Sequence, residues 1–263
     1  MGKVLILLII QGGLLFSQII PSANSAGLAN SGMLTRGDLS NFINNPAQLV
    51  YSNNKLSVSF VPHQFGVKEL QLQSYSVSAK FYAVNFGVAF SSYGYELYNS
   101  KKAFFAIAYP VTKQLSVGLC NEFSHLNIKN YGYKNNVKIN AGFTLTFEKL
   151  IFGLALKNIL QTKITKTESY SDFTFSGGVT YLEKQSFNLN LKFSNQINYT
   201  PNIAVGCEYY LADQFSTMIG YSLNPDFFSY GFRIYLKPVE LSFANKIHQT
   251  LGETLFFELN INY

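Results

Sequence analysis

The sequence predicts an all-β protein, a transmembrane antiparallel up-and-down β-barrel of about 14 strands with a short N-terminal helical hatch. Three observations predict this fold. Apolar residues recur at every second position through most of the chain after Asn54, which is the period of a strand with one apolar face. The residues between them are small or polar. Short and long connections alternate along the chain, as they do in outer-membrane barrels.

The composition is unusual for a soluble domain. Hydrophobic residues make up 48% of the 263 residues and charged residues only 13%, whereas charged residues are roughly a quarter of an ordinary soluble domain. The net charge is +6. Because the lysines are spread along the chain and form no cluster, nucleic acid is not an expected partner.

The N-terminus reads as a signal peptide. Lys3 precedes an apolar run at 4–16 that is too short to span a bilayer stably. Cleavage could follow Ser17 or Ser25, and a retained membrane anchor is the alternative. No later apolar run approaches the ~18 residues of a helical span. The expected division is a signal peptide at 1–25, a hatch or plug at 26–54 and the barrel at 55–263.

Fourteen candidate strands follow from the apolar phase. The opposite phase of each is small or polar, as in Ser57 and Ser59 or Asn188 and Asn190. When one face of a strand is apolar and the other is small or polar, the two faces must lie in different surroundings. The first apolar residues of the strands are Leu56, Tyr75, Val84, Phe105, Leu115, Val137, Leu150, Phe173, Phe187, Ile203, Phe215, Phe228, Val239 and Leu255.

The connections have two lengths. Tight turns are expected near Tyr82 and at 111–114, 148–149, 182–185, 211–214 and 237–238. Longer loops are expected at 61–70, 91–102, 125–136, 158–171, 194–202, 222–227 and 245–253. In outer-membrane barrels the tight turns face the periplasm and the longer loops face outward. A secreted β-sandwich or propeller is the rival fold.

A barrel places one phase in lipid and the other in a lumen. Leu154 then faces lipid, while Gly153 and Lys157 face the lumen. The lumenal charges have two interpretations, a hydrogen-bonded seat for the hatch, which we favour, or a selectivity lining for a solute. These charges are Lys80, Glu122, Lys138, Lys157, Lys192, Arg233, Glu240 and Glu258.

The last strand ends on an aromatic residue in the apolar phase. This ending resembles the C-terminal signal by which assembly machinery recognises bacterial outer-membrane barrels. The expected signal residues are Phe257, Leu259, Ile261 and Tyr263. The resemblance implies the barrel-assembly machinery and outer-membrane lipid as partners.

The segment before the barrel does not alternate. Asp38 is placed to cap a short helix carrying Leu39, Phe42 and Ile43. Pro46 can open a second turn with Asn45 as its cap. We expect a compact segment that folds into the lumen as a plug; a loosely ordered leader is the alternative.

The same segment resembles the start of the long-chain fatty acid transporter (FadL-like) superfamily and its relatives, the PorV/PorQ-type proteins of type IX secretion systems. The matching positions are Gly27, Leu28, Ala29, Gly32, Asp38, Asn45, Pro46, Ala47 and Leu49. The resemblance implies a fourteen-stranded barrel with an N-terminal hatch, in agreement with the count of strands.

Little in the sequence indicates chemistry. Ser124 and His125 are adjacent in a strand and therefore point to opposite faces, so a hydrolytic pair is not expected. No metal-ligand spacing appears, and we expect no cofactor, no metal and no catalytic residue. The phases place Cys120 and Cys207 on opposite faces of the barrel wall, so a disulfide is not expected.

These observations predict a protein of the Gram-negative outer membrane, exported by its signal peptide. The expected function is passage of hydrophobic small molecules across that membrane. The alternative is a non-enzymatic PorV/PorQ-like component of type IX protein secretion and surface attachment, with a secreted protein as partner.

Overall fold

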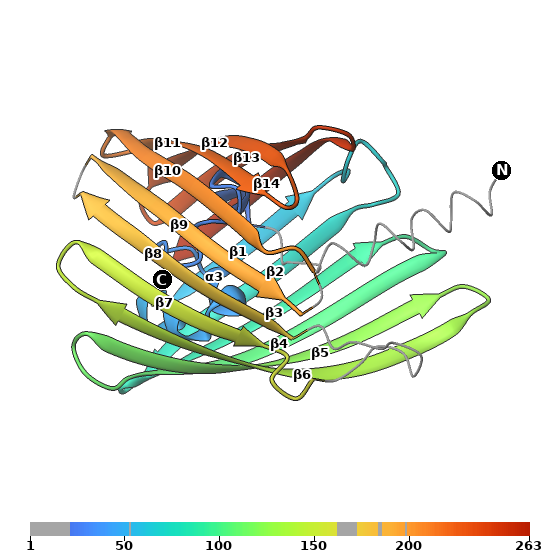
Figure 1. Ribbon diagram of the computed structural model, residues 1–263, viewed down its shortest axis with the longest axis horizontal. Helices are drawn as coiled ribbons and strands as arrows, with labels where there is room; N and C mark the ends of the chain where they lie inside the picture. The colour runs from blue at the N-terminus through green and yellow to red at the C-terminus, as the bar shows by residue number, and fades with distance from the viewer. Residues whose placement is uncertain (1–21, 53, 162–172, 184–185, 198) are drawn as a thin grey trace.

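The computed structural model describes residues 22–52, 54–161, 173–183, 186–197 and 199–263. Within them, antiparallel strands β1 to β14 form a closed barrel, in which each strand pairs with its neighbours in sequence and β14 returns to β1 (Figure 1). The predicted fold class is confirmed. The signal peptide expected at 1–25 lies outside the described residues, apart from positions 22–25.

The strands follow the predicted phases closely, and several extend further than predicted. They are β1 (Lys55–Val61), β2 (Leu72–Phe81), β3 (Val84–Gly94), β4 (Tyr98–Pro110), β5 (Leu115–Ile128), β6 (Gly132–Thr146), β7 (Leu150–Lys157), β8 (Thr174–Glu183), β9 (Phe187–Gln196), β10 (Asn202–Ala212), β11 (Phe215–Leu223), β12 (Phe227–Leu236), β13 (Val239–His248) and β14 (Gly252–Asn262).

Burial alternates along the strands as the two phases predict. In β7, Leu150, Phe152 and Leu154 are exposed on the outer surface, while Ile151 and Ala155 are buried inside the barrel. The same exposed apolar phase runs around the other strands. Because the strands close into a barrel, every backbone ladder finds a partner, and an apolar outer surface of this kind suits lipid.

The connections match the expected lengths at one end of the barrel, and several are shorter than expected at the other end. The tight turns are present, for example 82–83, 213–214 and 237–238. Three of the predicted long loops, 91–102, 125–136 and 245–253, are instead mostly strand. The backbone ladder continues through them, since Tyr98 pairs with Ile128 and Ser124 pairs with Asn136. Long hairpins therefore replace irregular loops where β4, β5 and β6 end.

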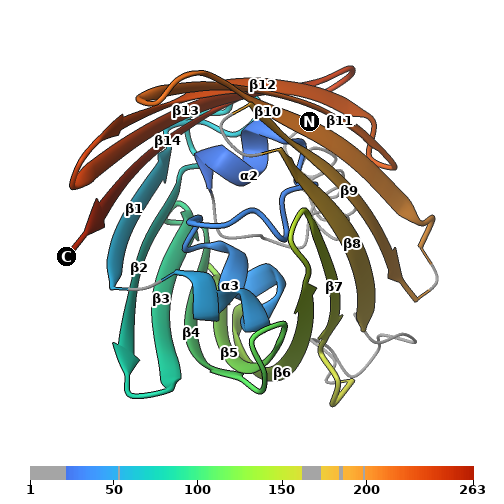
Figure 2. The ribbon, with the colours of Figure 1, turned by 90° about the vertical axis from the view of Figure 1, so that its left-hand side faces the viewer.

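The segment before the barrel fills the lumen (Figure 2). It contains helix α2 (Ala23–Gly27), helix α3 (Asn41–Asn44) and the 3-10 helix η1 (Pro46–Tyr51). Nearly all of residues 22–49 are buried. None of the helices in the described part of the chain is long and apolar enough to cross a membrane.

Candidate functional site

The contact between the hatch and the inner barrel wall is the candidate site, and the Asn45-Pro46-Ala47 turn is its best-defined part. The Asn45 side chain caps η1, because its Oδ1 accepts a hydrogen bond from the Ala47 backbone N–H at 3.1 Å. Its Nδ2 donates to the backbone oxygen of Phe143 and to Thr144 Oγ1, both at 3.2 Å. One side chain therefore orders the turn and also attaches it to β6.

Glycines in the wall make room for this turn. A Cβ added to Gly118 would lie 2.4 Å from the carbonyl carbon of Pro46, and one added to Gly142 would lie 2.1 Å from Asn45 Oδ1. Real Cβ atoms do not approach other atoms so closely, so the hatch can sit against β5 and β6 only where these positions lack side chains. Gly206 and Gly220 leave space for Leu28 of the hatch in the same way.

The remaining hatch motif residues hold the segment together or to the wall. The backbone oxygen of Gly27 accepts a hydrogen bond from Ser229 Oγ at 3.0 Å, and that of Gly32 accepts one from Asn41 Nδ2 at 2.8 Å. Leu49 packs on the apolar side of the hatch, in a cluster that joins it to β3, β4 and β5. The cluster contains Leu39, Phe42, Ile43, Leu49, Ala89, Phe104, Ala106, Ala108 and Cys120.

Asp38 does not cap a helix, contrary to the prediction. Helix α3 begins at Asn41 with Ser40 at its N-cap position, and no side chain makes a cap hydrogen bond there. Asp38 Oδ1 accepts hydrogen bonds from the Ser40 backbone N–H at 3.0 Å and from Ser40 Oγ at 2.6 Å. Its other oxygen accepts one from Ser22 Oγ at 2.8 Å. Asp38 therefore links the two parts of the hatch.

Two ion pairs, one buried and one partly exposed, lie near the short-turn end of the barrel. Arg233 Nη1 is 3.6 Å from Glu208 Oε1, and both side chains are buried. Lys55 Nζ is 2.9 Å from Glu240 Oε2 and also donates to the backbone oxygen of Gly37 in the hatch. Arg233 Nε donates to Asn24 Oδ1 at 2.8 Å. Each pair thus joins the barrel wall to the hatch.

A second group of lumenal charges is mostly basic. Lys102 Nζ is 3.4 Å from Glu122 Oε1, and Lys157 Nζ donates to Asn44 Oδ1 of the hatch at 2.9 Å. Lys246 Nζ lies over the rings of Phe227 and Phe256, at 4.5 and 5.3 Å from their centroids. Lys192 is buried and Lys138 half-buried, while Lys80 is exposed at the end of β2.

Four of these charged residues were not expected from the sequence. Lys102 and Lys246 lie in segments predicted as external loops, so neither was assigned to the lumenal face of a strand. Glu208 lies in the small and polar phase of the tenth predicted strand, and that phase could have identified it. Lys55 is the first residue of β1. Its burial, at 2% exposed, depends on the hatch that covers it.

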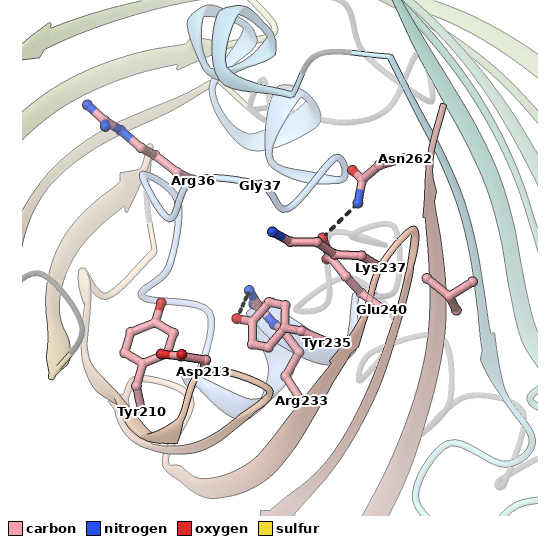
Figure 3. Close-up of a pocket in the computed structure, with 10 residues that line it drawn as sticks. Arg36, Gly37, Tyr210, Asp213, Arg233, Tyr235, Lys237, Glu240 and Asn262 are labelled. Carbon is pink, nitrogen blue, oxygen red and sulfur yellow. Dashed lines mark hydrogen bonds between the residues drawn. The ribbon is translucent and has the colours of Figure 1, made fainter.

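A cavity of about 380 Å³ opens below the hatch at the short-turn end (Figure 3). The side chains of Lys237, Tyr210 and Tyr235 point toward the space between them, and Arg233 lies behind Tyr235. Glu240 is held at one side by Asn262, whose Nδ2 donates to Glu240 Oε1 at 3.1 Å. The cavity therefore has a lining of tyrosine rings and polar groups. Its lining residues are Arg36, Gly37, Tyr210, Asp213, Arg233, Tyr235, Lys237, Val239, Glu240 and Asn262.

Ser124 and His125 do not form a hydrolytic pair in the described contacts. Ser124 Oγ donates to the backbone oxygen of Asn136 at 3.5 Å. His125 Nδ1 lies 2.7 Å from Asn135 Oδ1, and its ring stacks on Tyr133 at 5.7 Å between centroids. Cys120 and Cys207 are both free thiols.

The fold and the site define a class, a closed fourteen-stranded β-barrel with an apolar outer surface and a lumen filled by its own N-terminal segment. Solved structures of this shape include the toluene transporter TbuX of Ralstonia pickettii, with a TM-score of 0.69 and 9% sequence identity over 94% of this chain and 100% of that one. The toluene transporter TodX of Pseudomonas putida has a TM-score of 0.68 and 10% identity, over 94% of this chain and 97% of that one.

A FadL homologue of Pseudomonas aeruginosa is also similar, with a TM-score of 0.60 and 12% identity over 92% of this chain and 98% of that one. At these identities the likeness is one of fold. No protein-family model matches the sequence, and no curated protein matches it. The fold is therefore that of the FadL-like transporters, as the N-terminal motif led us to expect, whereas the PorV/PorQ-type branch has no counterpart among these structures.

Proposed function

We propose that the protein is an outer-membrane channel for hydrophobic small molecules, held closed by a hatch that can be displaced. The observation that carries this proposal is the polar character of the interface between the hatch and the wall. A permanent core would be apolar and fully paired. Here polar contacts such as Asn45 to Thr144, Gln48 to Thr144 and Arg233 to Asn24 join the hatch to the wall alongside the apolar cluster described above.

Several buried polar atoms at this interface make no hydrogen bond to another protein group. Among the described residues they include Asn24 Nδ2, Asn41 Oδ1, Gln48 Oε1 and Asn260 Oδ1. Each unsatisfied buried polar atom costs about 1–3 kcal/mol, and hydration would recover that energy when the hatch moves. The seated hatch is therefore held less firmly than a core of the same size.

The apolar side of the hatch offers a surface for an apolar solute. Leu39, Phe42 and Leu49 pack against Phe104 and small wall residues. Displacement of the hatch would leave both sides of this contact open to a hydrophobic molecule. The cavity of about 380 Å³ lies at the short-turn end, next to the hatch, and an apolar cavity of ~150 Å³ is large enough to hold benzene. A single-ring solute would therefore find room below the hatch.

The similarity to toluene transporters supports this function by fold alone. The apolar outer surface and the tight turns at the end where β1 begins and β14 ends support an outer-membrane location with that end in the periplasm. The alternative, a role in type IX secretion, gains no support from the structures compared above. The side-by-side strands form a closed wall, so in this proposal the solute enters through a lumen that opens only when the hatch moves.

Locking the hatch tests the proposal. We would replace Asn45 and Thr144 with cysteine in a protein whose Cys120 and Cys207 are changed to alanine, and measure toluene uptake by vesicles containing the purified protein. Oxidation should abolish uptake, and reduction should restore it. The single variant Asn45→Cys under the same oxidant is the control. Uptake that persists in the fully cross-linked protein would contradict a movable hatch.

Removing residues 26–48 tests the plug itself. The truncated barrel should conduct ions in planar bilayers far better than the intact protein, because the lumen loses most of its filling. Correct folding is checked by a change of gel mobility on boiling. If a folded truncated barrel is no leakier than the intact one, the segment is not a plug.

A further inference from the structure

Two buried carboxyl groups meet at one serine hydroxyl between the hatch and the wall. Ser22 Oγ lies 2.8 Å from Asp38 Oδ2 and 3.0 Å from Glu258 Oε2. It also accepts a hydrogen bond from the Ser25 backbone N–H at 3.1 Å, as the N-cap of α2. Ser22, Asp38 and Glu258 are each no more than 4% exposed, so bulk water does not reach these contacts.

The number of protons limits how these contacts can form. A serine hydroxyl donates one hydrogen bond and accepts two. If Ser22 donates to Asp38, the shorter contact, its remaining acceptor position can be filled only by a proton on Glu258 Oε2. If Ser22 donates to Glu258 instead, Asp38 must carry the proton. In either arrangement Ser22, Asp38 and Glu258 share two protons, the hydroxyl proton of Ser22 and one carboxyl proton. One of the two carboxyl groups is therefore neutral.

The surrounding charges do not remove this requirement. Glu258 Oε1 receives only neutral donors, Ser57 Oγ at 3.1 Å and Asn260 Nδ2 at 3.2 Å. Among the described residues, no lysine or arginine forms an ion pair with Asp38 or Glu258. The charges that face the pair are already matched, because Arg233 on β12 pairs with Glu208 on β10, and Lys55 on β1 pairs with Glu240 on β13.

We infer that Asp38, Ser22 and Glu258 form a proton-binding site that holds the hatch in its seat. Asp38 and Ser22 belong to the hatch and Glu258 belongs to β14, so the bound proton links the two across the interface. Loss of that proton would place two buried carboxylates at one hydroxyl and remove one hydrogen bond. The inference concerns how the hatch is seated and does not depend on which solute crosses the membrane.

The sign of the pH effect follows from counting protons. The closed state holds one proton that the open state, with both carboxylates in water, releases above about pH 4. Proton binding therefore favours the closed state, and rising pH favours opening. One proton changes the ratio of closed to open protein by at most about tenfold per pH unit.

The test uses the intact protein in liposomes and measures leakage of a small fluorescent solute over a range of pH. Leakage of the unaltered protein should increase as the pH rises. The variant Glu258→Gln should lose this dependence and stay closed, because its amide can donate to Ser22 without a titratable proton. Glu253→Gln is the matched control on the same strand, since Glu253 binds Asn245 and does not touch the hatch. It should keep the dependence of the unaltered protein.

Infrared spectroscopy detects the proton directly. The closed protein should show a buried carboxylic acid C=O band that shifts in D₂O and is absent from Glu258→Gln. If that variant does not fold, Asp38→Asn provides the same test from the hatch side. Leakage that does not change with pH, equal pH dependence in Glu258→Gln, or the absence of a protonated carboxyl band would each overturn the inference.

Discussion

Asn45 and Gly142 fit together at the centre of the hatch seat, where a Cβ added to Gly142 would lie 2.1 Å from Asn45 Oδ1. The asparagine caps its own turn and contacts β6 through the same side chain. The glycine provides the space for this contact. The seat therefore depends on a pair of residues that are 97 positions apart, and neither is explained by the strand pattern alone.

Gly142→Ala should push the hatch out of its seat. Overpacking of this kind costs about 1–3 kcal/mol, which raises the open fraction roughly 5- to 150-fold. Ion leakage through the purified protein in planar bilayers measures the effect. Gly177→Ala is the control, because a Cβ there would meet only Leu154 Cδ2, at an ordinary contact distance of 3.5 Å. Equal leakage from both variants would show that Gly142 does not seat the hatch.

The mature protein should begin near Gln18, not at Ala26. Of the two cleavage positions that the sequence allows, the one after Ser25 would remove Ser22 and Asn24. Both are buried and contact the barrel, Ser22 through Glu258 and Asn24 through Arg233. The intact mass of protein purified from outer membranes distinguishes the two. A mature mass starting at Ala26 would contradict this prediction and would also leave the proposed proton site incomplete.

The long hairpin of β5 and β6 should extend beyond the lipid. Leu119 lies on the exposed apolar face of β5, whereas Tyr133 lies near the tip of β6 and is 72% exposed. Leu119→Lys should lower the free energy of unfolding by about 2–4 kcal/mol, the cost of a lysine near the middle of the bilayer, and Tyr133→Lys by only ~0–1 kcal/mol. Reversible unfolding in lipid vesicles measures both. Similar losses would place the hairpin tip in the membrane.

Deletion of Tyr263, or Tyr263→Asp, should reduce insertion into the outer membrane much more than Asn262→Ser. Tyr263 directly follows β14 and continues its apolar phase. Its backbone N–H donates to Asn54 at 3.1 Å, and its hydroxyl donates to the backbone oxygen of Ser78 at 3.0 Å. The heat-modifiable band in outer-membrane fractions measures insertion. If all three variants insert equally, the last residue has no role in assembly.

Local patterns were sufficient to predict the barrel. Period two in the apolar residues reports which side of a strand meets lipid, and this holds for each strand separately. The prediction that Asn45 caps the turn beginning at Pro46 also rested on local sequence, and the structure confirms it as the cap of η1. Strand ends were less accurate at 91–102, 125–136 and 245–253, because backbone pairing needs no apolar residue to continue.

The partners of the lumenal charges were decided only by the tertiary structure. Arg233 with Glu208, Lys55 with Glu240, and Ser22 with Glu258 are pairs that meet because the barrel closes and the hatch enters it. The sequence by itself determined that the inner face would be small and polar. Which of those polar groups touch depends on the register of fourteen strand pairs and on the path of one segment through the lumen. Neither is a property of any local stretch of sequence.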